Sequence, residues 1–181
     1  MNDDVRQSLY QQLLGADFDR MPDALRELHR LSSSSEFAGD AEVIAGDHWL
    51  ARLLALCTGL PTRSRRCRVR VRVRIDIDPA GETWHRDFDG HRFHSRMSRA
   101  KAHLVERLGP HRIGFQLQAD ANGLRMLPVS WRLLGIPLPR ALWPRVDASE
   151  QARDGRFHFD VATSFPWIGR VVHYRGWLQR A

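Results

Sequence analysis

The sequence is poor in cysteine and lysine, and it lacks any long apolar run. Its 181 residues include only two cysteines, Cys57 and Cys67, with no metal-ligand spacing around them. This argues against a disulfide framework or a zinc site and favours reduced thiols that are buried or half-buried. No window reaches the roughly 18 apolar residues that a membrane-spanning helix requires, and the acidic, polar N-terminus is unlike a signal peptide. We therefore expect a cytoplasmic protein, at most peripheral to a membrane, that holds no metal and no cofactor.

Lys101 is the only lysine among 28 basic residues, so arginine carries almost all of the positive charge behind the formal net charge of +7. Such a skew is typical of a GC-rich genome, and the basic residues are spread along the whole chain. The charge alone therefore does not indicate nucleic-acid binding, which we regard as the weakest of the functional readings. The length and the 43% hydrophobic content suit a single domain spanning residues 1–181.

Residues 68–78 alternate strictly between β-branched apolar residues and charged residues. Such period-two alternation predicts a strand with one apolar face and one solvent face, which is typical of an antiparallel sheet. Turn signals such as Asp89-Gly90 and Asp154-Gly155 recur at short intervals, so consecutive strands are expected to pair as hairpins. The same one-sided pattern recurs in later segments, notably residues 113–119, 127–133 and 157–163.

The first third of the chain has helical periodicity instead. One helix is expected from Val5 to a stop at Gly15, a second after Pro22, and a third after an N-cap at Asp47. A strand is expected over residues 37–43. We therefore predict an α+β fold with a helical part at about 3–60 and a β-rich part at about 66–180. Its sheet is a strongly curved antiparallel β-meander, either a partly closed barrel or a half-barrel of roughly eight to ten strands. About three N-terminal helices would plug or flank its concave side.

No nucleophile elbow, phosphate loop or dinucleotide-binding turn occurs, so the sequence gives no positive sign of an enzyme. Five histidines lie between residues 85 and 111, but without compact metal-ligand spacing, and we expect them on the solvent face of strands. His158 and Asp160 share a strand face and are expected to form a pair in solvent.

Two charged residues in apolar strands are the more informative candidates. Glu106 shares its parity with Leu104 and Leu108, and Arg175 lies in a mainly apolar final strand. If both face the interior, they would hold the polar end of a ligand; the alternative is that each reaches the rim or forms a structural ion pair. The candidate ligand-binding residues are Glu106, Phe115, Leu117, Trp131, Phe157, Phe159, His173 and Arg175.

A family resemblance rests on an ordered string of segments, and it covers the chain from about Leu9 to Leu178. The segments are residues 9–15, 104–110, 131–139, 155–161 and 174–178. Together they resemble the bacterial domain-of-unknown-function family 4166. The family also occurs fused to saccharopine-dehydrogenase-like reductases and to YndJ-type membrane proteins. The resemblance therefore implies a helper or ligand-handling module, whose reductase or membrane-protein partner would act in trans here.

The leading hypothesis is a non-catalytic binding domain that shelters a lipid-like or other apolar or amphipathic small molecule in the curved sheet. The proline-bounded segment Gly135–Pro139 would cover the mouth or edge of the sheet. One alternative is an accessory module that docks on a reductase or membrane partner. The other is an undescribed enzyme, for which Glu106, His173 and Arg175 form the cluster to test.

Overall fold

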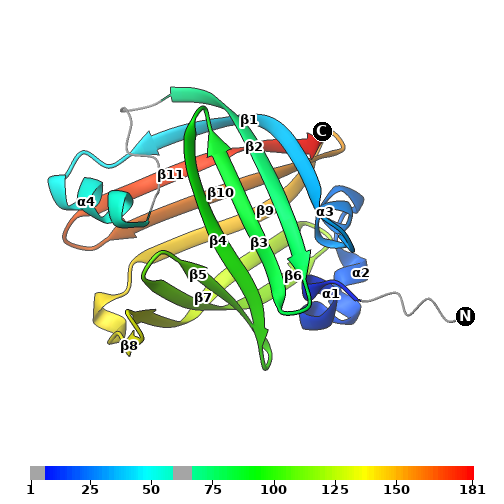
Figure 1. Cartoon of the computed structure of the whole chain (residues 1–181), viewed down its shortest axis with the longest axis horizontal. Coiled ribbons are helices and arrows are strands. Elements are labelled where there is room, and N and C mark those ends of the chain that lie inside the picture. Colours follow the sequence, from blue (N-terminus) through cyan, green and yellow to red (C-terminus); the bar gives the residue numbers. More distant parts are fainter. Residues whose placement is uncertain (1–6, 59–66) are drawn as a thin grey trace, which may run out of the picture.

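Antiparallel strands form a closed barrel in the computed structural model, which describes residues 7–58 and 67–181 (Figure 1). Within these ranges, ten strands make up the wall, and the two-residue strand β8 (Ile136–Pro137) extends one edge. Neighbours follow the order β6-β5-β4-β3-β2-β1-β11-β10-β9-β7, and β7 also pairs with β6, which closes the ring. The strands are β1 (Ser35–Ala45), β2 (Cys67–Asp78), β3 (Gly81–Phe88), β4 (His91–Ala100), β5 (His103–Leu108), β6 (His111–Asp120), β7 (Gly123–Leu133), β9 (Arg145–Arg153), β10 (Arg156–Phe165) and β11 (Gly169–Arg180).

The predicted α+β fold with a curved antiparallel meander is confirmed, and of the two forms left open the sheet takes the closed one. In β2 the apolar parity faces inward: Val71, Val73 and Ile75 are buried, while the intervening arginines point to solvent. The two predicted hairpin turns are also confirmed. Asp89-Gly90 joins β3 to β4 and Asp154-Gly155 joins β9 to β10, each with both residues at positive φ, as a tight two-residue turn requires.

Three short helices precede the sheet: α1 (Leu9–Leu14), α2 (Ala16–Arg20) and α3 (Asp23–His29). Ser8 and Gln11 form a capping box that fixes the start of α1. Gly15 ends α1 as expected, but α2 follows at once, so this region holds one helix more than predicted. The expected helix after Asp47 is α4 (Trp49–Thr58). Three features of the sequence analysis lie outside the described parts of the chain: Val5, the boundary between the helical and β-rich parts within residues 59–66, and the side chain of Cys57. Cys67 is a half-buried free thiol.

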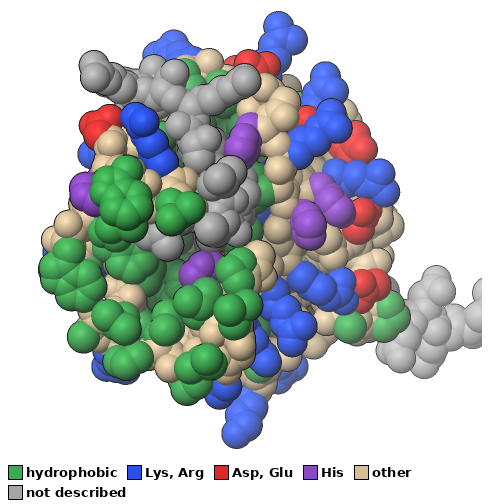
Figure 2. All heavy atoms as spheres, turned by 60° about the vertical axis from the view of Figure 1, so that its left-hand side comes forward, with side chains coloured by type: hydrophobic (Ala, Val, Ile, Leu, Met, Phe, Trp, Pro, Cys, Tyr) green, Lys and Arg blue, Asp and Glu red, His purple; other side chains and the backbone are tan. Residues whose placement is uncertain are grey.

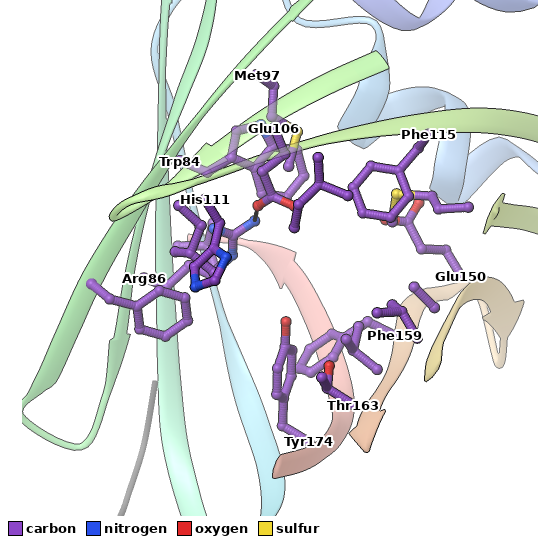
Figure 3. Close-up of a pocket in the computed structure, with 18 of the residues that line it drawn as sticks. Trp84, Arg86, Met97, Glu106, His111, Phe115, Glu150, Phe159, Thr163 and Tyr174 are labelled. Atoms are coloured by element: carbon purple, nitrogen blue, oxygen red, sulfur yellow. Dashed lines mark ion pairs between the residues drawn. The ribbon is translucent and has the colours of Figure 1, made fainter. Parts of the chain in front are cut away.

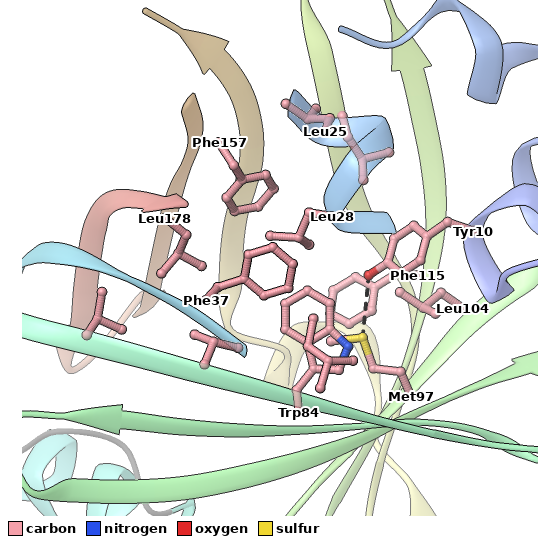
Figure 4. Close-up of a cluster of buried hydrophobic side chains, with 14 of the residues drawn as sticks. Tyr10, Leu25, Leu28, Phe37, Trp84, Met97, Leu104, Phe115, Phe157 and Leu178 are labelled. Carbon is pink, nitrogen blue, oxygen red and sulfur yellow. Dashed lines mark hydrogen bonds between the residues drawn. The ribbon is translucent and has the colours of Figure 1, made fainter. Parts of the chain in front are cut away.

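Helices α1–α3 plug one end of the barrel and complete its core there. Tyr10, Leu25 and Leu28 are fully or almost fully buried and join the barrel side chains in one apolar cluster (Figure 4). Phe18 of α2 is buried in the same cluster. The Tyr10 hydroxyl donates a hydrogen bond to Sδ of Met97 on β4, at 3.4 Å. The opposite end carries α4, β8 and the 3₁₀ turn η1 (Arg140–Leu142) (Figure 1). In the described residues, no helix is long and apolar enough to cross a membrane.

The wall has one weak seam, between β7 and β9. These strands pair only from Leu124 to Met126, near the plugged end, whereas other neighbours pair over most of their length. Toward the opposite end they separate, and residues 134–144, which contain β8 and η1, connect them. The ring of paired strands is therefore complete near the plugged end, and β7 and β9 are unpaired toward the other end.

Candidate functional site

A cavity of about 160 Å³ occupies the barrel interior above the plug. An engineered apolar cavity of roughly 150 Å³ suffices to bind benzene, so this one has room for a small organic guest. Most of its wall is aliphatic or aromatic, and the cavity runs from the core near the plug to residues at the opposite end, Pro144, Val146 and Phe165. Its polar lining residues are Arg86, Glu106, His111, Glu150, Thr163 and Tyr174.

Arg86 projects from β3 into this apolar interior, where its guanidinium lies over the rings of Trp84 and Phe93. It donates a hydrogen bond to the Ser95 hydroxyl at 2.8 Å. An η nitrogen of Arg86 also lies 3.9 Å from a carboxylate oxygen of Glu106 on β5, at the long limit of an ion pair (Figure 3). The Arg86 guanidinium thus contacts two aromatic faces and one hydroxyl instead of water. The Glu106 carboxylate balances its charge without a close hydrogen bond.

His111 and Tyr174 add two polar groups near this pair. Because Trp131 Nε1 can only donate, its 3.0 Å contact makes His111 Nδ1 the acceptor, and the neutral ring then carries its proton on Nε2. Burial lowers the pKa of His111 and so favours that neutral ring. Tyr174 lies on the opposite wall with its hydroxyl toward Glu106 and Arg86 (Figure 3). Burial raises the pKa of Tyr174 to about 12, so its hydroxyl remains a donor at neutral pH.

The floor of the cavity is fastened to the plug by a buried pair. Nε2 of His29, on α3, lies 2.6 Å from a carboxylate oxygen of Glu150 on β9, and their side chains are 0% and 6% exposed. The imidazole packs against Tyr10 with ring centroids 3.8 Å apart. Glu82 is buried nearby and accepts a 3.0 Å hydrogen bond from Trp84 Nε1; burial raises the pKa of Glu82. The pair therefore ties a helix to the wall at the sealed end.

The eight candidate residues from the sequence fall into three groups in the structure. Side chains on the inward parity lie in the cavity wall, and these are Glu106, Phe115, Trp131, Phe157 and Phe159. Leu117 has the same parity but is half-buried against the core and does not line the cavity. Whether the wall residues bind a ligand remains a prediction.

His173 and Arg175 lie on the outer face of β11, so of the two possibilities left open for Arg175 the structure shows the structural ion pair and not an interior contact with Glu106. Arg175 instead pairs with Glu42 on β1, with nitrogen and oxygen 2.7 Å apart. His173 lies 2.8 Å from Asp160 on β10, which replaces the expected pairing of His158 with Asp160. The side chains of β11 that point inward include Tyr174 and Leu178. The sequence does not reveal which face is inside, because apolar residues occur on both faces of this strand. The enzyme cluster of Glu106, His173 and Arg175 is therefore split by the barrel wall.

Three polar residues in the barrel interior were not predicted from the sequence to lie there: His111, Arg86 and His29. His111 was expected on the solvent face but lines the cavity, because its parity is that of Ile113. Arg86 shares its parity with Trp84 and Phe88, a signal that was present but masked by the number of arginines elsewhere. His29 follows Leu25 and Leu28 on the buried face of α3. In the described residues, no group of three or more histidine, cysteine or acidic side chains is placed to hold a metal ion.

Comparison with known proteins gives a family and no activity. The family described as a domain of unknown function, DUF4166, matches residues 21–178. A protein of unknown function from the DUF3598 family of Nostoc punctiforme is similar at 12% identity and a TM-score of 0.47; the match covers 81% of this chain and 47% of that one. Rv2717c from M. tuberculosis is similar at 12% identity and a TM-score of 0.46, over 89% of this chain and 99% of that one. This chain thus spans about half the length of the first of these structures, and no curated protein matches it.

Proposed function

The chain belongs to the DUF4166 family, and we propose that it binds a small, mainly apolar molecule with one neutral polar end inside the barrel. The observation that carries the proposal is the cavity itself, which is mainly apolar but has Arg86, Glu106, His111 and Tyr174 near one another in its wall (Figure 3). A few polar groups in an apolar pocket are typical of small-molecule sites, where they orient the guest.

The charges in this group favour a hydroxyl or carbonyl over a carboxylate. Glu106 already balances Arg86, so an anionic guest would add a second negative charge beside Glu106 in a medium of low polarity. Tyr174 and His111 Nε2 supply donors, and Glu106 supplies an acceptor. A neutral hydroxyl can accept from Tyr174 and donate to Glu106, whereas a carboxylate can only accept and would leave Glu106 without a donor.

Titration calorimetry with 1-octanol and with octanoate at pH 7 tests the proposal. We expect 1-octanol to bind and octanoate to bind more weakly. Tyr174→Phe should weaken 1-octanol binding by about 3- to 10-fold, the equivalent of one hydrogen bond. Toluene has no hydrogen-bonding end, and its affinity should not change in this variant.

A matched pair of variants on β10 separates the cavity from the rest of the molecule. Val161 lines the cavity, whereas Ala162 points to the outer face. Val161→Phe fills part of the cavity and should abolish binding of both probes, and Ala162→Phe should leave it unchanged, with circular dichroism confirming that both variants fold. Equal probe binding by the two variants would refute an interior site. Native mass spectrometry of the purified protein would then identify any guest that it carries.

A further inference from the structure

The end of the barrel opposite the plug exposes large apolar side chains that the proposed interior site does not involve. Seven large hydrophobic residues are exposed in the described parts of the chain, and all but Leu127 lie at this end. They come from α4, from the segment that connects β7 to β9, and from the turn between β10 and β11. Figure 2 shows hydrophobic side chains gathered where α4 and β8 lie. We name this set the mouth rim: Trp49, Leu53, Leu134, Ile136, Leu142 and Trp167.

This exposure is large for side chains of this type. Trp167 is 66% exposed, Trp49 67% and Ile136 67%. Single exposed apolar residues are common on protein surfaces, but a group of them from three separate segments at one end marks an interaction site. The two tryptophans have both an apolar ring and an N–H donor, the combination enriched where a protein meets the boundary of a bilayer.

Exposed arginines accompany the mouth rim. Their side chains come from the same segments and from the strand ends beside them, and none forms an ion pair with an acidic side chain in the described residues. The guanidinium of Arg140 lies over the ring of Trp143, and Arg132 donates to the carbonyl oxygen of Gly135. The exposed acidic residues of these segments are Asp47 and Asp147. The arginines are Arg52, Arg132, Arg140, Arg145 and Arg170.

We propose that the mouth rim docks the barrel onto a lipid surface that carries anionic headgroups. The apolar side chains would enter the boundary between headgroups and acyl chains, and the arginines would bind lipid phosphates. The arrangement is that of a peripheral protein, in which apolar insertion and electrostatic attraction act together.

Charge favours this occupant over a second copy of the chain. In a two-fold contact through the mouth rim, the arginines of one copy would face those of the other, and like charges would oppose association. An anionic lipid surface is complementary to the same residues. The position also fits: Pro144, Val146 and Phe165 line the cavity next to the rim. Where the proposed interior site also holds, a guest could pass between lipid and cavity with little exposure to water.

Co-sedimentation with vesicles tests the proposal. The full chain should bind vesicles of phosphatidylcholine with phosphatidylglycerol in low salt, and at least about tenfold more weakly vesicles of phosphatidylcholine alone, because several arginines contribute. The double variant Ile136→Ser, Trp167→Ser should weaken binding to the anionic vesicles by about tenfold or more. Leu127→Ser is the matched control, since Leu127 is an exposed apolar residue outside the rim, and this variant should bind as the unaltered chain does.

Two further measurements complete the test: vesicle binding by variants whose arginines are replaced with glutamate, and the oligomeric state of the chain. Arg140→Glu with Arg145→Glu should reduce binding to anionic vesicles, whereas binding to neutral vesicles should change little. Equal affinity for both vesicle types, or no effect of the rim variants, would overturn the proposal. A dimer in light scattering that the rim variants dissociate would also overturn it, in favour of a second copy. Val161→Phe should keep vesicle binding, so loss of the interior site can be told apart from loss of docking.

Discussion

Replacing His29 with alanine tests whether the plug is fastened to the barrel by one buried pair. The His29 and Glu150 side chains are almost completely enclosed, and their contact is short, at 2.6 Å. Removal of the imidazole leaves the Glu150 carboxylate buried without its partner, close to the buried Glu82. Breaking a buried pair in this way costs about 3–5 kcal/mol of unfolding free energy. For a chain of this size that loss lowers the melting temperature by about 6–20 °C.

Two controls distinguish this electrostatic reason from a simple loss of packing. His29→Leu combined with Glu150→Leu removes both partners and leaves no uncompensated charge, so most of the lost stability should return. His173→Ala removes a histidine whose contact with Asp160 is similar in length, 2.8 Å, but exposed on the outer face. That variant should lose no more than about 1 kcal/mol.

Urea denaturation followed by tryptophan fluorescence measures all three variants, with thermal unfolding as a second readout. We expect the order of stability to be unaltered chain, then His173→Ala, with His29→Ala well below both. If His29→Ala and His173→Ala lose equal stability, the buried pair does not hold the plug and the reasoning is refuted.

Three further predictions concern the barrel wall. Ile75→Ala empties a fully buried position and should cost about 2–5 kcal/mol in urea denaturation; a loss under 1 kcal/mol would contradict the core described here. Hydrogen bonds from Arg96 lower the pKa of Asp78 to about 2, below its usual 3.8. The stability that the ionised Asp78 carboxylate contributes is therefore present above about pH 4 and is lost as the pH falls toward 2. Asp78→Asn should flatten that part of the stability profile. Burial raises the pKa of Glu82 above 4.5, so this carboxyl makes the fold less stable as the pH rises past 4.5, and Glu82→Gln should raise the urea midpoint at pH 7.

The local part of the fold could be predicted from the sequence because its signals lie within a few residues of one another. The alternation in β2 predicted which side chains are buried, and the Asp-Gly pairs predicted the hairpins. Closure could not be predicted in this way. It depends on β1 pairing with β11, a segment far along the chain, and on β7 pairing with β9 past the intervening β8; neither pairing has a local signal in the sequence. The sequence therefore does not decide between a half-barrel and a closed barrel.

The candidate site shows the same division. Parity within a strand placed Phe115, Phe157 and Glu106 on the wall, where the structure has them. It failed in β11, where Val171 and Val172 are both buried and apolar residues occupy both faces of the strand. It also could not pair His29 with Glu150, because these residues are 121 positions apart and meet only when the helices enter the barrel end.

The two ends of the barrel differ in chemistry, and this difference would decide how a guest of the proposed interior site enters. At the plugged end, opening would separate His29 from Glu150 and expose the core side chains of α1 and α3, which is costly. At the other end, β7 and β9 are not paired, and the cavity is bordered by Pro144 and Val146 beside the mouth rim. A guest of the proposed site that passed between β7 and β9 at this end would break no β7–β9 pairing, so we expect this route to have the lower barrier. His29→Ala should therefore lose stability but retain vesicle binding, whereas Ile136→Ser with Trp167→Ser should bind anionic vesicles more weakly but retain stability.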